Sequence, residues 1–277
     1  MSTILSPKVG ENRLSEMTSP DTTPETKCWA ARWYAEMMVE LFLSDTAKQK
    51  KKDFESLSLG NKIKEISEEY SEKLISSLYL IEDLGNQASH FKKGRAITEA
   101  ESIKAVENAI GLFDLILVDL FKNQGLAKTL NTAKIFSTFL PSIRVNVLAK
   151  LLDFSKFDNN SEYDIGVLHK YLLALTKNGQ REKARRLIKK LLKKETIDQD
   201  MFTYWENSIN VISNNSKNLP IPKSIEDCKR NFDDVLIILS NEDLSENSRL
   251  IEIFNILLES VTPSEMGDLI GNQLFPA

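Results

Sequence analysis

The chain has 277 residues, a formal net charge of −4 and 42% hydrophobic residues. This hydrophobic content predicts a folded protein of one large or two modest domains, and it excludes disorder over the whole chain. The negative net charge excludes a protein that coats nucleic acid with its whole surface, so any such contact must be local.

Several classes of site and compartment have no support in the sequence. Cys28 and Cys228 lie far apart and fit neither a disulfide framework nor a zinc site. The N-terminus has no secretory pattern, and no run approaches the roughly 20 apolar residues of a membrane span. Motifs typical of cofactor, metal or nucleophile sites are lacking. We therefore expect a cytoplasmic protein without a membrane partner, cofactor or metal.

The N-terminal half is predicted to be an arm followed by a helical domain. Residues 1–24 contain three prolines among polar residues, which predicts a flexible N-terminal arm. Residues 25–125 lack proline and have helical spacing throughout. The first helix is expected over 26–43, with a core-facing stripe of Trp29, Trp33, Met37 and Leu41. The lysine-rich run at 48–52 predicts a solvated loop, with a phosphate contact as the alternative.

Two further helices flank a polar segment, Leu84–Phe91, that includes His90 on a short helix of its own. The helix before the segment is predicted from apolar residues at Ile63, Ile66, Tyr70, Leu74, Leu78 and Ile81. The helix after it begins at a capping box formed by Thr98 and Glu101. Its apolar face is predicted to contain Ile103, Val106, Ile110, Phe113, Leu117 and Leu120.

The segment Gly85-Asn86-Gln87-Ala88-Ser89-His90, with its flanking helices, resembles the HEPN superfamily over residues 26–122. Within that superfamily it is most similar to the prokaryotic domain of unknown function that occurs in some restriction-enzyme subunits. The resemblance implies a helical bundle that forms a homodimer. In active members it implies a metal-independent ribonuclease, in which a histidine moves protons at the 2′-hydroxyl and an arginine holds the phosphate.

His90 and Asn86 match the histidine and the polar position of that motif, and they are the candidate catalytic residues. Gly85 stands at the arginine position, and Glu82 and Asp83 precede it, where a carboxylate would repel a phosphate. Three roles for the segment stay open: holding the loop backbone, binding a nucleotide or nucleic acid without catalysis, and catalysis. Catalysis would need a cation from elsewhere, such as Arg32, Lys92, Lys93 or Arg95.

Residues 126–277 predict a second helical domain. Helices are expected at 126–139, 142–154, 198–213, 224–240 and 245–260. Between the second and third of these, two amphipathic helices joined at Asn178-Gly179 resemble a tetratricopeptide-type hairpin, with Gly179 and Ala184 at its small-residue positions. A single hairpin predicts a local packing unit rather than a repeat array.

The second helix of this hairpin is strongly basic, and Glu182 is the one acid between Lys177 and Lys194. Two interpretations stay open: a solvated helix, and a face that binds RNA, DNA or an acidic protein partner. His169, on the first helix, is interpreted as a structural histidine. The cations of the predicted face are Arg181, Lys183, Arg185, Arg186, Lys189, Lys190, Lys193 and Lys194.

The sequence as a whole favours an all-α, non-catalytic HEPN-like binding or regulatory protein. Association with nucleic acid in prokaryotic or phage defence is what the resemblance implies. One alternative is a metal-independent HEPN-type ribonuclease that uses His90. The other is a helical protein–protein adaptor in which the HEPN-like domain serves for dimerisation.

Overall fold

The computed structural model describes residues 6–89, 96–126, 130–154 and 162–259. Within these ranges it contains 14 α-helices and two short 3-10 helices and no strand, which confirms the predicted all-α class. The chain divides into two compact units, one within residues 6–119 and one within 120–258. The division falls inside helix α6, before the boundary at 125 that the sequence predicts.

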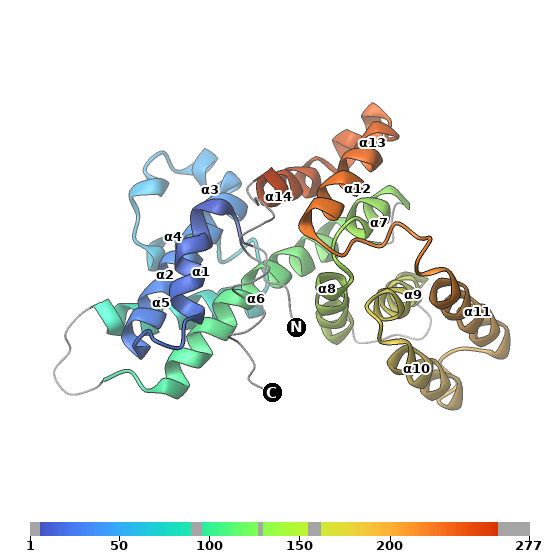
Figure 1. Ribbon diagram of the computed structural model, residues 1–277. Coiled ribbons are helices and arrows are strands. Elements are labelled where there is room, and N and C mark those ends of the chain that lie inside the picture. Colours follow the sequence, from blue (N-terminus) through green and yellow to red (C-terminus); the bar gives the residue numbers. More distant parts are fainter. Residues whose placement is uncertain (1–5, 90–95, 127–129, 155–161, 260–277) are drawn as a thin grey trace. The chain divides into compact units, whose positions relative to one another are not determined.

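The prediction of a flexible arm is wrong for the described part of residues 1–24. This part forms η1 (Lys8–Gly10) and α1 (Glu11–Thr18), and α1 packs against α2 (Pro24–Phe42) (Figure 1). Leu14 and Met17 are buried, at 2% and 1% exposed. The guanidinium carbon of Arg13 lies 4.4 Å from the centre of the Trp29 ring, in a cation–π contact. An eight-residue helix has too few apolar positions to show a period, so polar composition misled the prediction.

Helix α2 begins at Pro24, slightly before the predicted start at residue 26, and the Thr26 N–H donates to Oγ1 of the N-cap Thr23. The predicted core stripe is wrong in part: Met37 is buried, but Trp29 is 37% exposed. A four-residue step exceeds one helical turn, so a stripe of four such residues drifts by about 120° around the helix. The face that enters the core is formed instead by Cys28, Ala31, Tyr34, Ala35, Met38 and Phe42.

The lysine-rich run is a loop only in part: residues 48–50 end α3 (Asp45–Lys50), Lys51 and Lys52 follow the helix, and three of the four lysines are paired. Lys48 Nζ lies 3.0 Å from Glu40 Oε2, and Lys50 Nζ and Lys51 Nζ each lie 2.7 Å from a glutamate oxygen. The single helix expected over residues 63–81 is two helices, α4 (Leu59–Ile66) and α5 (Glu72–Ser89), which follow η2 (Phe54–Ser56). Helix α5 lies beside α2 (Figure 1).

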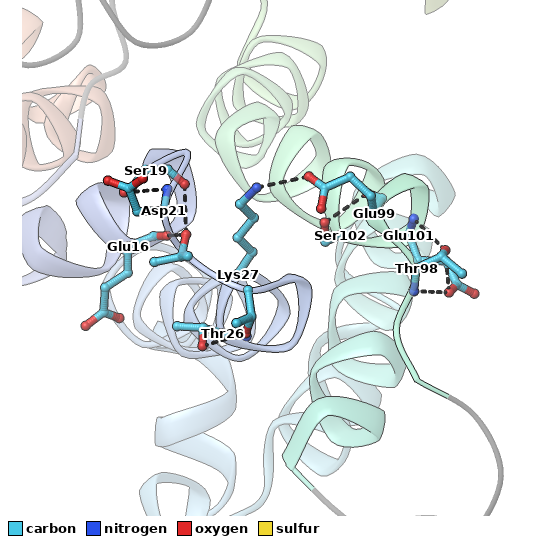
Figure 2. Close-up of polar contacts among 11 residues, drawn as sticks. Glu16, Ser19, Asp21, Thr26, Lys27, Thr98, Glu99, Glu101 and Ser102 are labelled. Atoms are coloured by element: carbon cyan, nitrogen blue, oxygen red, sulfur yellow. Dashed lines mark hydrogen bonds and ion pairs between the residues drawn. The ribbon is translucent and has the colours of Figure 1, made fainter.

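Helix α6 (Glu99–Gln124) starts at the predicted capping box. The Thr98 N–H donates to Glu101 Oε2 over 3.0 Å, and the Glu101 N–H donates to Thr98 Oγ1 over 3.3 Å (Figure 2). Lys27 Nζ of α2 lies 3.0 Å from Glu99 Oε1, as Figure 2 also shows. Most of the predicted apolar face is buried or half-buried, but Ile103 is 46% exposed.

The second unit is built from the end of α6 and eight further helices within the described ranges. Helices α8 and α9 pack together, and α9, α10 and α11 contact one another pairwise (Figure 1). Two buried aromatic rings, Phe139 and Phe254, lie 3.9 Å apart between centres and join the loop before α8 to α14. The helices are α7 (Leu130–Ser137), α8 (Pro141–Phe154), α9 (Glu162–Lys177), α10 (Arg181–Lys193), α11 (Gln199–Asn215), α12 (Ile225–Ile237), α13 (Asn241–Glu246) and α14 (Ser248–Glu259).

The predicted helical hairpin is present as α9 and α10. Gly179 has a φ of +75°, a left-handed conformation that favours glycine, and the Gln180 N–H donates to the Leu175 carbonyl over 2.8 Å. Ala184 is fully buried. A Cβ at Gly179 would meet nothing within 4 Å, so this glycine serves the turn rather than close packing. The helix expected at 245–260 corresponds to α14, and the short helix α13 before it was not predicted.

Candidate functional site

The polar segment of the first unit is not a break between helices. Residues 84–89 form the last turns of α5, and the Ser89 hydroxyl donates to the Gly85 carbonyl over 2.8 Å. The predicted short helix at His90 and the predicted histidine itself lie outside the described residues, as do Lys92, Lys93 and Arg95. The structure therefore gives the surroundings of Asn86 but no position for the histidine of the motif.

Helix α5 packs closely against α2 at Gly85. A Cβ added at Gly85 would lie 2.3 Å from the Cβ of Arg32 and 2.7 Å from its Cδ. The side chain of Arg32 thus lies across Gly85, next to Asn86 in the chain. Its Nε is buried without a hydrogen-bond partner among the described residues. The arginine that the motif lacks on its own helix is present on the neighbouring helix.

The carboxylates before Gly85 are engaged with side chains one turn later on α5. The Asn86 amide donates to Glu82 Oε1, and the Gln87 amide donates to Asp83 Oδ2 over 2.8 Å. A Cβ at Gly60, in the first turn of α4, would lie 3.0 Å from Glu82 Oε1. A carboxylate is favoured beside a helix N-terminus, which gives Glu82 a structural reason for its place.

The basic residues predicted on α10 do not all face solvent. Arg181 and Arg185 both donate to Asn210 Oδ1 of α11, over 3.0 and 2.7 Å. These two arginines therefore join α10 to α11. The other six predicted cations are exposed: Lys183, Arg186, Lys189, Lys190, Lys193 and Lys194.

The exposed lysines of α10 differ from those of the earlier lysine run. Lys48, Lys50 and Lys51 are all paired with glutamates. No ion pair involves the exposed α10 lysines within the described part of the chain, and Arg186 donates only to the Glu182 backbone carbonyl, over 3.3 Å. The α10 cations are thus available to a partner, whereas the earlier run is neutralised by its own unit.

His169 packs against aromatic rings of α11, in agreement with its interpretation as a structural histidine. Its ring is stacked on Trp205, with ring centres 5.6 Å apart and planes 4° apart, and Tyr204 lies at the same distance. Burial, and then the nearby Lys170, lower the pKa of His169 below its ordinary value of 6.5. The neutral ring is therefore favoured in the folded protein.

Sequence reasoning missed a second cluster of cations, in the interior of the second unit. Arg144 of α8 and Lys170 and Lys177 of α9 line one cavity of about 70 Å³. Two features of the sequence could have indicated them: Arg144 stands alone among apolar residues, and the two lysines are seven residues apart, on one face of a helix. Neither feature resembles a known motif, so the cluster becomes visible only in the fold.

Comparisons with known proteins add no further information on the site. The chain matches none of the family models, curated proteins or solved structures with which it was compared. Among the residues that the structure describes, no group of three or more His, Cys, Asp or Glu side chains could hold a metal ion. No helix in those same ranges is long and apolar enough to cross a membrane.

Proposed function

We propose that this protein is a non-catalytic binding protein that contacts nucleic acid through the exposed face of α10. The observation that carries the proposal is the row of six exposed cations on and directly after α10, whose lysines have no ion pair within the described ranges. Lysines on a helix can neutralise successive backbone phosphates and release the counterions bound there. The buried side of the same helix, with Ala184 and Ile188, fixes the row on the second unit.

Nucleic acid is a better partner for this face than an acidic protein. Protein–protein interfaces are depleted in lysine and depend on a few aromatic or arginine anchors at their centre. Helix α10 contains no aromatic residue, and two of its three arginines are bound to Asn210. A face of flexible point charges without anchors suits a phosphate backbone and predicts little preference for base sequence.

The contacts of the HEPN-like segment support a binding role over catalysis. The Asn86 amide is held by Glu82, and Asp83 lies on the same turns of α5. Two carboxylates beside a scissile phosphate raise the cost of the charge that develops on it. A role as a homodimeric regulatory component in prokaryotic or phage defence is proposed only from the resemblance to HEPN proteins.

Binding of a labelled single-stranded RNA, measured by fluorescence anisotropy over a salt series, tests the proposal. Reversing Lys189 and Lys190 to Glu is expected to weaken binding by about tenfold at low salt and to reduce the salt slope by roughly 1 to 2. The matched control reverses Lys52 and Lys64, two exposed lysines of the first unit, with the same change in net charge. Equal losses in both pairs, or no binding at low salt, would reject the α10 face.

A metal-independent ribonuclease is the second candidate, and the position of Arg32 favours it. Its side chain lies across Gly85, and its Nε has no partner within the described residues. A guanidinium held there could bind a phosphate beside Asn86. Incubation of the pure protein with mixed RNAs in EDTA tests this candidate: cleavage that disappears in both His90→Ala and Arg32→Ala would replace the non-catalytic proposal.

A further inference from the structure

The interior of the second unit holds a cavity that is not part of the α10 face. It has a volume of about 70 Å³ and lies among α7, α8 and α9. One water molecule needs about 10–15 Å³ of such space, so this cavity has room for several waters or for one small ion. Its apolar walls include Leu126, Ala133, Phe136, Leu148, Leu173 and Ala174.

Arg144 is the most unusual side chain in this cavity. It is only 4% exposed, and its Nε and Nη2 have no hydrogen-bond partner among the described residues. Burial lowers its pKa to about 10, which still leaves the group charged at neutral pH. A buried charge without a partner is costly and in folded proteins is normally paired or bound to a ligand.

Lys170 and Lys177 add two more cations from α9. Seven residues separate them, which puts them two turns apart on one helix face, and both line the same cavity as Arg144. Burial, and then the charges of Arg144 and Lys170, lower the pKa of Lys177 to about 8. The charged forms of both lysines are thus disfavoured by burial and then by a neighbouring cation, as is typical of cations gathered without an anion.

Nothing in the described lining supplies a counter-charge. The lining residues include no aspartate or glutamate, and the one hydroxyl, that of Ser137, donates to the Ala133 carbonyl over 2.6 Å. Cys228 interacts electrostatically with Arg144, but burial raises the pKa of its thiol to about 12, so it stays neutral. The site therefore carries several positive charges with no anion from these residues.

We propose that this cavity binds a phosphate dianion, held by the guanidinium of Arg144 and the ammonium groups of Lys170 and Lys177. A phosphate carries up to two charges and offers oxygens in the geometry that a guanidinium binds bidentately, whereas a carboxylate brings a single charge. Arg144 supplies orientation and the two lysines supply charge. The apolar walls lower the local dielectric, which strengthens each charged contact.

This proposal is independent of nucleic-acid binding at α10, because the cavity and the exposed face share no residue. The phosphate can be inorganic or the terminal phosphate of a strand, and the two sources share the chemistry of a dianion. Lys177 ends α9 only a few residues before α10, so a strand end is a reasonable source. Oligonucleotides with a 5′-phosphate or a 5′-hydroxyl separate the two sources.

Isothermal titration calorimetry of the protein with inorganic phosphate tests the site. A parallel titration with sodium chloride at the same ionic strength is the reference. We expect saturable binding that falls by about tenfold or more in Arg144→Met and in Lys177→Met, since each removes a charge-assisted hydrogen bond. Lys189→Met, which removes an exposed cation of α10, is expected to leave phosphate binding unchanged. If the wild type binds the 5′-phosphate oligonucleotide more tightly than the 5′-hydroxyl one and Arg144→Met loses this preference, the ligand is a strand end. If inorganic phosphate binds but the two oligonucleotides bind equally well, the ligand is the free ion.

Thermal unfolding separates a ligand site from a merely structural arginine. In chloride alone, Arg144→Met is expected to melt at or above the wild-type temperature, because an unpaired buried charge is removed. Phosphate is expected to raise the melting temperature of the wild type but not that of the variant. The proposal is overturned if phosphate has no more effect than chloride, or if Lys189→Met loses phosphate binding as much as Lys177→Met does.

Discussion

Gly85→Ala is expected to destabilise the first unit, because Gly85 is where α5 meets α2. The new Cβ would lie 2.3 Å from Arg32 Cβ, an atom attached directly to the backbone of α2. The helices must separate, and overpacking of this kind costs up to about 3 kcal/mol. Alanine in place of glycine within a helix returns about 1 kcal/mol. The net loss is therefore up to about 2 kcal/mol.

Gly111→Ala is the matched control for this substitution. Gly111 is also a helical glycine of the first unit, and a Cβ added there would meet nothing within 4 Å. Only the helix-propensity term remains, so this variant is expected to gain about 0.5–1 kcal/mol. The two variants make the same chemical change and are expected to shift stability in opposite directions.

Urea unfolding, monitored by tryptophan fluorescence, measures the free energy of unfolding of both variants, since Trp29 and Trp33 lie on α2. Hydrogen exchange of peptides from α2 and α5 then shows whether the loss is confined to that helix pair. The reasoning is refuted if Gly85→Ala is as stable as Gly111→Ala. That result would mean that Arg32 does not lie across Gly85, and it would also remove the support for the ribonuclease candidate.

Two further predictions concern pH. Burial raises the pKa of Glu40, but hydrogen bonds from Lys62 and Lys48 outweigh it and hold the pKa below the ordinary 4.5. The ionised Glu40 contributes its full stabilisation above pH 4.5, and this is lost as the pH falls through the pKa of the folded state. Glu40→Gln is therefore expected to lower the free energy of unfolding by about 1 kcal/mol at pH 7. It is also expected to flatten the acid limb of a plot of urea midpoint against pH. An unchanged acid limb would contradict this. The lowered pKa of His169 has the same sign in a higher pH range: the unfolded chain binds its proton more readily, so stability is complete above pH 6.5 and falls in acid. His169→Phe is expected to weaken this dependence in thermal melts between pH 7 and 5, and an identical profile would count against the buried neutral ring.

Local patterns in the sequence were sufficient for most of the helices. The capping box at Thr98, the N-terminus of α2 and the glycine turn after Lys177 all depend on residues within one helical turn of each other. Such contacts can be predicted from the sequence because both partners lie close together in the chain. The all-α class and the basic character of α10 follow from the same local information.

The faces of the helices and the partners of the charges were decided by tertiary packing. The sequence could not show that Arg13 of α1 would lie over the Trp29 ring, that the lysines after Asp45 would be paired with glutamates up to 19 residues away, or that Arg181 would bind Asn210. The same holds for Arg32 across Gly85 and for Arg144 beside the two lysines of α9. A lone cation has the same appearance in a sequence whether it is paired, exposed or buried without a partner, because its energy depends on groups brought near only by folding.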